Sequence, residues 1–580
     1  MPSRRPSPLL LLSTASLLLP HPALAAPNNT CTTPFTPLSA STFIAALNPG
    51  WNLGNTLDAL PTEGSWNNPP VQPSTISAVR SAGYASVRIP VTYTEHFVSG
   101  SPNWDIDRQW LQRVSDVVDM VLAQNLSAII NVHHDSTSWA DITAPSANIS
   151  QIEERFYRLW YQVAGKLGCK GSKLGFEPIN EIPGTTAEHG AQVNRMNEVF
   201  LQAVNDAGGW NGGRVVTLVG AGEDGGKTSM WFKRPDKKFG NPWGIQYHYY
   251  SPYDFIFSAW GKTIWGSDAD KAALEADIAA VRGNFSDVPL VIGEWSASPT
   301  ALESAARWRY FDHLIRTATK YNTSLMLWDN GNDYLDRNSL TWRDPIAQSI
   351  LSTAIHGIPN ALPDSTTDPS SPSQSSSAEL YHRANSTIKD TSLSFALNAN
   401  TLTSITHGTR TLTPNTDYTF SPTGTLTLLT PLLTSIFTPP TLGPRANLTL
   451  HFTPGTPLSL TLISFSPAPS SLNSTTLPLP PSGQDLLIPI PWSALGTSRP
   501  AAVKAVRGDG TYLVDDWTQW LGELQRGRMT YGGQWDWDGR GVLVKSGVVE
   551  MVRKEGKGVR FEVEFWPRGE GGRVGVEVGG

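Results

Sequence analysis

Short apolar runs rich in β-formers alternate with loops and amphipathic stretches from about residue 43 to residue 358. The amphipathic stretch 107–125 places Leu111, Val118 and Leu122 on one face at helical spacing, together with Val114 and Val121. Eight β-rich runs, each followed by loop and helix-like material over roughly 300 residues, predict a (β/α)8 TIM barrel, a fold of about 250 residues. The runs are GWNLGN (50–55), ASVRIPV (85–91), AIINVHH (128–134), LGFEPINE (174–181), RVVTLVGA (214–221), GIQYHYYSP (244–252), PLVIGEW (289–295) and SLMLWDNG (324–331).

A doubly wound open sheet is the competing α/β architecture. That fold commonly marks its dinucleotide site with a G-x-G-x-x-G turn after the first strand. No such turn follows the first β-rich run, 50–55, so the barrel is the preferred interpretation of residues 43–358.

The pattern changes after the predicted barrel. Residues 359–378 are rich in Pro, Ser and Thr and predict a linker with nothing to bury. Residues 379–466 alternate apolar and small polar positions between Pro or Gly turns, which predicts a small Ig-like β-sandwich. A second Pro/Ser-rich break opens residues 467–580, which predict a second β domain. The expected fold class is therefore α/β, a TIM barrel followed by two small β-sandwich domains.

The N-terminus has the pattern of a secretory signal peptide. Arg4 and Arg5 precede an apolar block at 9–19 and the small-residue site Ala23-Leu24-Ala25. We expect residues 1–25 to be removed and the protein to be secreted and extracellular. No other apolar run reaches the roughly 18 residues that a membrane span needs.

Secretion gives meaning to other sequence features. Eight N-x-Ser/Thr sequons suggest a glycoprotein with some of them occupied. The two cysteines, Cys31 and Cys169, are expected to form a disulfide in an oxidising compartment, and two buried free thiols are the alternative.

Composition favours a carbohydrate as the ligand. The chain has 21 Trp residues and a net charge of −6, and no run of Lys and Arg marks a phosphate-binding surface. A nucleic-acid partner is therefore not expected, whereas flat aromatic faces suit sugar rings. In the last domain we expect a C-terminal tryptophan platform for sugars, formed by Trp517, Trp520, Trp535 and Trp537.

Polar and aromatic residues gather at the predicted C-terminal strand ends, where TIM barrels hold their active sites. A single His or Trp at such a place is more often a packing residue, but repetition on seven of the eight runs favours a site. These residues are Asn55, Arg88, His133, His134, Asn180, Glu181, His248, Tyr250, Glu294 and Trp328.

Glu181 and Glu294 are the strongest candidates for chemistry, because each carboxylate ends a buried β-rich run. Two carboxylates across a barrel mouth can hydrolyse a glycosidic bond. A separation of about 5–5.5 Å gives retention, and about 6.5–9.5 Å gives inversion. We expect a neighbouring negative charge to raise the pKa of the acid and an adjacent Arg to keep the other carboxylate ionised.

Seven motifs in order closely resemble glycoside hydrolase family 5, and its subfamily 4 of endo-β-1,4-glucanases and xyloglucanases in particular. They are GWNLGNTLDA, VRIPV, NVHHD, INE, HYYSP, GEW and LWDNG. The resemblance implies a retaining enzyme with Glu181 as acid/base and Glu294 as nucleophile. It further implies that Arg88 holds Glu294, that Asn180 reaches a sugar 2-hydroxyl, and that the remaining residues line the site or contact substrate. Those are His133, His134, His248, Tyr250, Trp328, Asn55 and Asp58.

The C-terminal parts resemble an Ig-like X2 module (387–466) and carbohydrate-binding module family 46 (484–580). In enzymes with this layout the last module folds back on the barrel, so it is expected to help bind branched glucan. A monomer acting on β-glucan polysaccharides, without a cofactor or metal, is the resulting prediction.

Three alternatives stay open at this point. A β-mannanase would use the same fold and acid pair, and a non-catalytic carbohydrate-binding protein would keep the barrel as a scaffold. A metallohydrolase using His133 and His134 is disfavoured, because neighbours on a strand point to opposite faces and no H-E-x-x-H motif is present.

Overall fold

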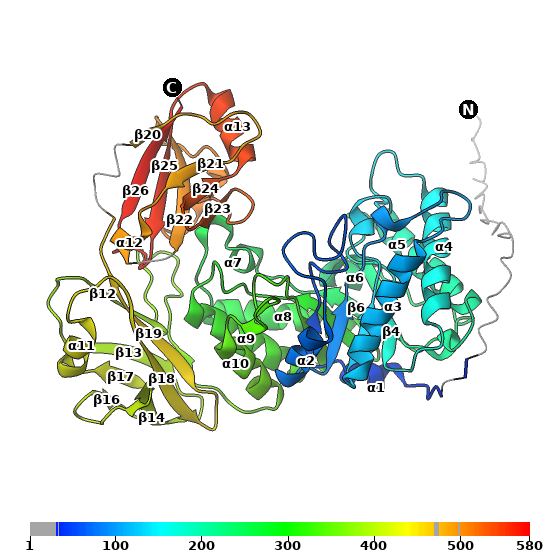
Figure 1. The fold of residues 1–580 in the computed structure, drawn as a ribbon, viewed down its shortest axis with the longest axis horizontal. Helices are drawn as coiled ribbons and strands as arrows, with labels where there is room; N and C mark the ends of the chain where they lie inside the picture. Colours follow the sequence, from blue (N-terminus) through cyan, green and yellow to red (C-terminus); the bar gives the residue numbers. More distant parts are fainter. Residues whose placement is uncertain (1–30, 33, 469–474, 497–498, 580) are drawn as a thin grey trace, which may run out of the picture.

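The computed structural model describes residues 31–32, 34–468, 475–496 and 499–579. A closed parallel barrel forms the first domain, with strand order β1 to β8 and β8 pairing with β1 (Figure 1). Each of the eight predicted β-rich runs overlaps a barrel strand, so the predicted TIM barrel is confirmed. The strands are β1 (Gly50–Asn52), β2 (Ser86–Ile89), β3 (Ser127–Ile130), β4 (Leu174–Phe176), β5 (Val216–Asp224), β6 (Trp243–His248), β7 (Leu290–Trp295) and β8 (Thr323–Leu327).

Amphipathic helices surround the barrel. The predicted helix 107–125 is α3, which begins at Arg108 because the Asp107 side chain caps it by accepting the Gln109 N–H. The others around the barrel are α2 (Pro73–Ser81), α4 (Ile149–Leu167), α5 (Ala187–Asp206), α6 (Gly225–Trp231), α7 (Tyr253–Ile256), α8 (Asp268–Asn284), α9 (Ser304–Lys320) and α10 (Pro345–Ile355).

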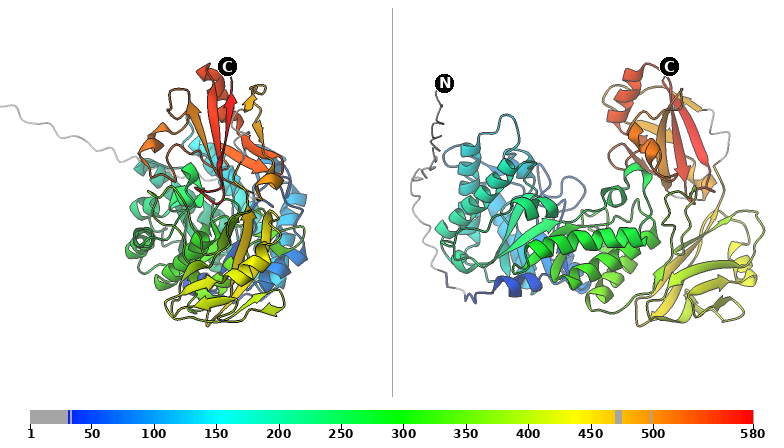
Figure 2. Two further views of the ribbon diagram at one scale, coloured as in Figure 1. Left: turned by 90° about the vertical axis from the view of Figure 1, so that its left-hand side faces the viewer. Right: turned by 180° about the vertical axis from the view of Figure 1, so that it is seen from behind.

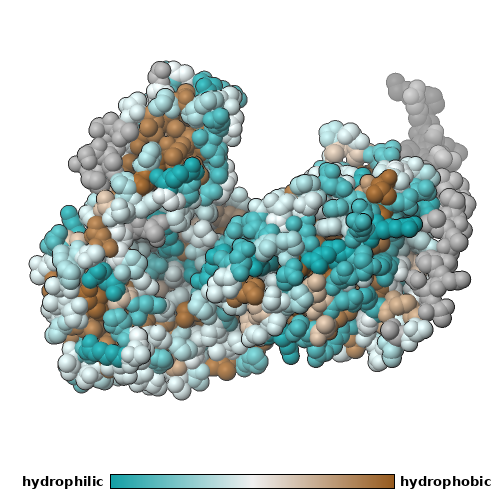
Figure 3. Space-filling model, in the orientation of Figure 1, coloured by the Kyte–Doolittle hydropathy of each residue, from teal (hydrophilic) through white to brown (hydrophobic). Residues whose placement is uncertain are grey.

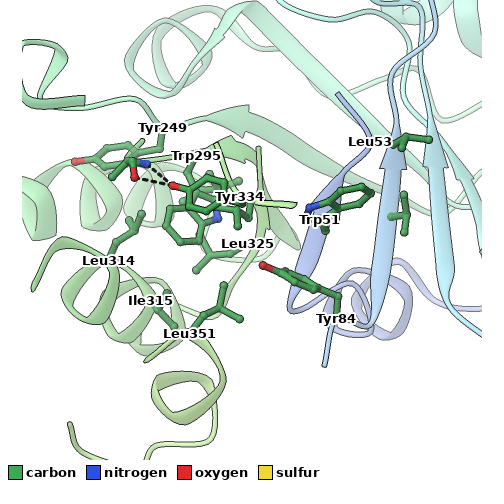
Figure 4. Close-up of a cluster of buried hydrophobic side chains, with 14 of the residues drawn as sticks. Trp51, Leu53, Tyr84, Tyr249, Trp295, Leu314, Ile315, Leu325, Tyr334 and Leu351 are labelled. Carbon is green, nitrogen blue, oxygen red and sulfur yellow. Dashed lines mark hydrogen bonds between the residues drawn. The ribbon is translucent and has the colours of Figure 1, made fainter. Parts of the chain in front are cut away.

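Apolar packing fixes the barrel from outside and from below. Trp295 of β7 packs edge-on against Phe311 of α9, beside Leu314 and Leu325 (Figure 4). At the N-terminal end of the strands, α1 (Ala40–Ala45) inserts Phe43 against Gly175, where a Cβ would lie 2.7 Å from the Phe43 ring. Apolar side chains thus close the N-terminal end of the barrel. The polar side chains lie at the opposite end, the C-terminal mouth.

Several barrel strands are shorter than the runs that predict them. β3 ends at Ile130 and β4 at Phe176, so His133, Asn180 and Glu181 follow the strands in loops, and His134 begins a short 3₁₀ helix (His134–Thr137). Loop backbone is not bound to the two-residue alternation of a strand. Consecutive side chains can therefore enter the same cleft.

The second domain is a two-sheet β-sandwich (Figure 2). One sheet has the order β11 (Leu362–Pro363), β13 (Thr391–Ala396), β17 (Thr425–Leu428), β16 (Tyr418–Phe420). The other has the order β12 (Glu379–Arg383), β19 (Leu458–Phe465), β18 (Gly443–Thr453), β14 (Thr401–His407), β15 (Arg410–Thr411), and α11 (Thr430–Phe437) lies between β17 and β18 in the chain.

The prediction of an unburied linker at 359–378 is wrong. β11 within it pairs with β13, and Asn360, Gln374 and Ser377 are buried. Asn360 accepts the Thr456 N–H of the sandwich and donates to Asp312 of the barrel. The uncharged polar side chains that make the segment look like a linker instead bond to the domains on either side of it.

The third domain also has two sheets and stands above the second domain, next to α7 of the barrel (Figure 1). Its sheets have the orders β20 (Thr475–Leu477), β26 (Arg573–Val578), β25 (Val559–Phe565), β22 (Pro500–Arg507) and β21 (Leu486–Pro489), β24 (Gly541–Val544), β23 (Trp535–Asp538). The short α12 (Trp492–Leu495) and α13 (Ser546–Glu555) complete it.

Buried polar contacts join the third domain to the barrel. Arg568 is 2% exposed and donates to the Gly261 carbonyl at 2.7 Å and to Thr263 Oγ1 at 2.9 Å. Gln374, from the segment before the sandwich, bonds to the same Thr263. A buried Arg with these contacts resists separation of the domains, since parting them would leave its donors to be paired with water instead. These contacts therefore hold the third domain against the barrel, beside its mouth.

Cys31 and Cys169 form a disulfide that ties the N-terminal segment to the end of α4. The predicted signal peptide, 1–25, lies outside the described residues. Among the described helices, none combines the length and the apolar character that crossing a bilayer requires.

Candidate active site

A cleft of about 890 Å³ opens at the C-terminal ends of the barrel strands. Seven of the predicted site residues line it, and Arg88 and His248 are buried close by. Figure 3 shows a hollow between the third domain and the barrel. The seven are His133, His134, Asn180, Glu181, Tyr250, Glu294 and Trp328.

Arg88 is the centre of the buried charges beneath the cleft. It is fully buried and forms a two-pronged ion pair with Glu177, with both N–O distances 2.7 Å. Its Nη1 also donates to Glu294 at 2.5 Å, and its Nη2 donates to Asn180 at 2.9 Å. Its Nη1 donates to Asn52 of β1 as well, at 3.0 Å. One planar guanidinium thus holds four side chains, which a point charge such as Lys could not do.

Glu294 lies at the end of β7 and is 5% exposed. The Tyr250 hydroxyl donates to its Oε2 at 3.0 Å, and Arg88 donates to its Oε1. Burial raises the pKa of Glu294 above its ordinary value, although His248 and Arg88 act in the opposite direction. The carboxylate is therefore held in one orientation with an oxygen facing the cleft.

Glu181 follows β4 at φ +41°, a backbone conformation that few non-glycine residues adopt. Its side chain is 43% exposed, and its Oε1 lies 2.7 Å from His248 Nδ1. Burial raises the pKa of Glu181, but the hydrogen bond and charge of His248 outweigh this and leave the pKa below its ordinary value.

The predicted order of the two carboxyl pKa values is therefore wrong. We expected a raised pKa for Glu181 and a pKa for Glu294 that Arg88 keeps low. Glu294 is the more deeply buried of the two, while His248 lies against Glu181, so the structure has the reverse order. The two carboxylates are close, since an oxygen of each and a nitrogen of His248 lie within 4.8 Å of one another.

An aromatic wall forms one side of the cleft. Trp328 stacks on His133 with an angle of 6° between the ring planes and 5.7 Å between centroids. His134 packs against His133 and against Trp66, which is 47% exposed. Both histidines follow β3 and line the same cleft, so the argument that they point to opposite faces is wrong.

Asn55 and Asp58 shape the loop after β1 and do not line the cleft themselves. Asp58 accepts the backbone N–H groups of Asn55 and Thr56 and lies 3.5 Å from His134 Nε2. They therefore hold the loop that carries Trp66.

Two groups in the described part of the chain have donor atoms close enough together for a metal ion. One is Asp58, His133 and His134, and the other is Glu181, His248 and Glu294. In the first, Asp58 is engaged by backbone N–H groups and His133 Nδ1 by Asn131. The second is the carboxylate pair itself, with His248 between its members.

Several site residues escaped the sequence prediction. Glu177 and Glu223 are fully buried carboxylates under the cleft. A charged residue within an apolar strand run was the available signal for Glu177 in FEPINE. Tyr531, Gly532 and Asp536 of the third domain also line the cleft, and no local pattern marks residues that act through domain placement.

The predicted C-terminal tryptophan platform is only partly exposed. Trp535 is 2% exposed and belongs to the core of the third domain, so its assignment to the platform is wrong. Trp537 is half-buried and packs against Trp492. Trp517 and Trp520 are 44% and 82% exposed, and Trp517 meets Trp260 of the barrel edge-on at 4.6 Å.

A closed (β/α)8 barrel with a pair of close carboxylates at its mouth is an arrangement that suits glycoside hydrolysis. Residues 51–334 match the family model Cellulase (glycosyl hydrolase family 5), and residues 374–462 match Carbohydrate binding domain X2. Endoglucanase B of Paenibacillus lautus is 30% identical over 76% of this chain and 78% of its own length.

Solved structures and other relatives agree. A tri-modular family 5 (subfamily 4) endo-β-1,4-glucanase of Bacillus licheniformis, complexed with cellotetraose, has 31% identity and a TM-score of 0.82, covering 93% of this chain and 99% of its own. A xyloglucan-specific endo-β-1,4-glucanase of Bacteroides ovatus is 29% identical over 53% of this chain and 67% of its length. The chain therefore belongs to glycosyl hydrolase family 5 and is an endoglucanase.

Proposed function

We propose that this endoglucanase is secreted and retaining, that Glu181 is its general acid/base and Glu294 its nucleophile, and that it cleaves β-1,4-glucans including branched xyloglucan. The observation that carries the assignment is the different support of the two carboxylates. Glu294 is held by Arg88 and Tyr250, which suits attack from one fixed position, whereas Glu181 is partly exposed at the rim, where it can reach a leaving oxygen.

The mechanism follows in two displacements. Glu294 attacks the anomeric carbon while the Glu181 proton passes to the departing glycosidic oxygen, which leaves a glycosyl ester on Glu294 and an ionised Glu181. Glu181 then takes a proton from water, and the hydroxide oxygen displaces Glu294 from the anomeric carbon. The closeness of the carboxylate oxygens supports retention, since inversion needs room for a water between them.

Substrate binding is expected to change the surroundings of Glu181. A glucan chain over Glu181 removes the solvent that reaches its half-exposed side chain. Loss of that solvent disfavours the charged carboxylate and raises its pKa. Glu181 can then carry the proton that the first step requires.

Two walls of the cleft bear on the class of substrate. Phe257 lines the cleft, and Tyr253, Trp260 and Trp517 continue from it as neighbouring aromatic rings toward the third domain. Tyr531 and Asp536 add a second wall from that domain. A cleft between two such walls suits a long glucan with side branches. The cellotetraose complex of one relative and the xyloglucan specificity of another support this class.

A reducing-sugar assay on carboxymethyl cellulose, mixed-linkage glucan, xyloglucan and mannan tests the assignment. We expect activity on the three glucans and little on mannan. Dominant mannan activity would favour a β-mannanase instead, and binding without release of reducing ends would favour a non-catalytic binding protein. Secretion and the monomeric state are tested by the N-terminus of the exported protein, expected near Ala26, and by its size in solution.

Tyr531→Ala should lower kcat/KM on xyloglucan by about fivefold or more, because Tyr is among the residue types whose truncation at a binding surface most often costs over about 1 kcal/mol. Short unbranched cello-oligosaccharides should lose much less, since they need only the barrel wall. The exposed Arg540→Ala, in the same domain but outside the cleft lining, is the matched control. Equal losses on both substrates would mean that Tyr531 supports the domain interface rather than branched substrate.

A further inference from the structure

Glu223 is a buried carboxylate to which the mechanism above gives no task. It lies near the end of β5, where the pairing with β6 shifts register between Val219 and Asp224. Its φ is +48°, a conformation that a non-glycine residue rarely adopts, and it is 0% exposed. The bulge turns this side chain into the barrel, and such local strain is found most often at functional sites.

The contacts of Glu223 lead to Glu181 by two routes. Its Oε2 accepts the backbone N–H of Glu181 at 2.8 Å, and its Oε1 accepts the Gln246 amide at 3.2 Å. The same Oε2 lies 3.3 Å from His248 Nε2, and the other ring nitrogen of His248 lies 2.7 Å from Glu181 Oε1. His248 is thus placed between two carboxylates, one buried and one at the rim.

We propose that Glu223 is a positioning residue for the glucanase reaction, which holds the proton shared by His248 and Glu181 and fixes the peptide that carries Glu181. This inference rests on the proposed role of Glu181 as acid/base. Where Glu223 is ionised beside Nε2, the ring keeps a proton on that side and presents Nδ1 to Glu181. Because burial raises the pKa of Glu223 to about 8, this charge acts on the alkaline side of the pH profile. One proton can then lie on Glu181 or on His248 without a change in the total charge of Glu181, His248 and Glu223.

The surrounding charges agree with this role. The groups that face Glu223 are His248 from β6, Glu177 after β4, Arg88 from β2 and the peptide of Glu181. Burial raises the pKa of Glu223 to about 8, with His248 opposing the rise. Burial lowers the pKa of His248, but Glu223 and Glu294 outweigh it and raise the value to about 9. Since the pKa values of Glu223 and His248 are both raised, these two side chains retain protons to higher pH than free side chains would.

Glu223→Gln is the test, because it removes the charge and preserves the shape. Without that negative charge the His248–Glu181 pair should lose its proton at lower pH. On a cello-oligosaccharide, kcat/KM should fall about tenfold relative to wild type on the alkaline side of the profile and change much less on the acid side. With a dinitrophenyl cellobioside, whose leaving group needs no proton, the difference in kcat/KM should vanish.

Two further variants separate this role from a structural one. Asp224→Asn removes the same charge from the exposed neighbour and keeps its capping bond to Lys227, so its profile should match wild type. Glu223→Asp restores the charge and should recover part of the alkaline activity, while thermal unfolding reports whether each variant is folded. Equal losses at every pH on both substrates, or a wild-type profile for Glu223→Gln, would overturn the inference. A wild-type protein inactive on all glucans would instead contradict the proposed function itself.

Discussion

Glu294→Gln is expected to lower turnover of a soluble cello-oligosaccharide by at least about 10⁴-fold, because an amide cannot act as the nucleophile in a double displacement. The substitution preserves shape. The amide oxygen can still accept from Arg88, and the amide nitrogen can face the Tyr250 hydroxyl as a donor. Cellotetraose should therefore bind the variant with an affinity close to that of the wild type.

Calorimetric titration with cellotetraose and a reducing-sugar assay measure the two properties separately. Glu198→Gln makes the same chemical change on the exposed face of α5 and should retain full activity. Residual activity above about a hundredth of wild type would exclude Glu294 as nucleophile. Loss of binding together with turnover would show that the change had disturbed the cleft rather than the chemistry.

The barrel was predictable because its signal is local. Each strand and helix imposes its own period on a few neighbouring residues, and eight repeats of the pattern leave few other folds. The ends of the β-rich runs also follow from sequence, since Pro183 and Gly184 interrupt the run that carries Glu181, although β4 itself already ends at Phe176. Seven of the predicted polar and aromatic site residues consequently meet in one cleft.

What escaped prediction depends on contacts between distant segments. Glu223 enters the barrel only because β5 bulges, and Glu177 matters only because Arg88 of β2 lies opposite it. Trp535 and Trp517 look alike in sequence, yet one is core and the other is exposed beside the barrel. The order of the two carboxyl pKa values likewise depends on which one His248 approaches more closely, and no local pattern contains that distance.

Arg88→Met is expected to destabilise the protein by about 3–5 kcal/mol near neutral pH, the cost of leaving a buried charge without its partner. Glu177 is 0% exposed and would keep only the Asn131 amide as a described donor. Glu294 would lose one of its two holding contacts, so kcat should fall together with stability. Arg88→Lys should recover only part of both, because one ammonium cannot reproduce the two-pronged pairing.

The pH dependence distinguishes this charge effect from simple loss of packing. Burial raises the pKa of Glu177, but Arg88 and Asn131 outweigh it and leave the value below its ordinary range. In the wild type, Glu177 therefore adds stability above the pKa of an unfolded glutamate, and that stability is lost as pH falls through the lower folded value. Without Arg88, burial alone should raise the pKa, so the ionised side chain becomes a cost at neutral pH that protonation removes.

The stability deficit of Arg88→Met should accordingly shrink as the pH is lowered below about 5, measured by urea unfolding at several pH values. Arg214→Met is the matched control. Arg214 is equally buried, but its guanidinium donates to backbone carbonyls such as those of Leu174 and Lys170. Its removal should destabilise by a similar amount at every pH in this range. A deficit of Arg88→Met that does not change with pH would mean that its packing, rather than its pairing with Glu177, supports the fold.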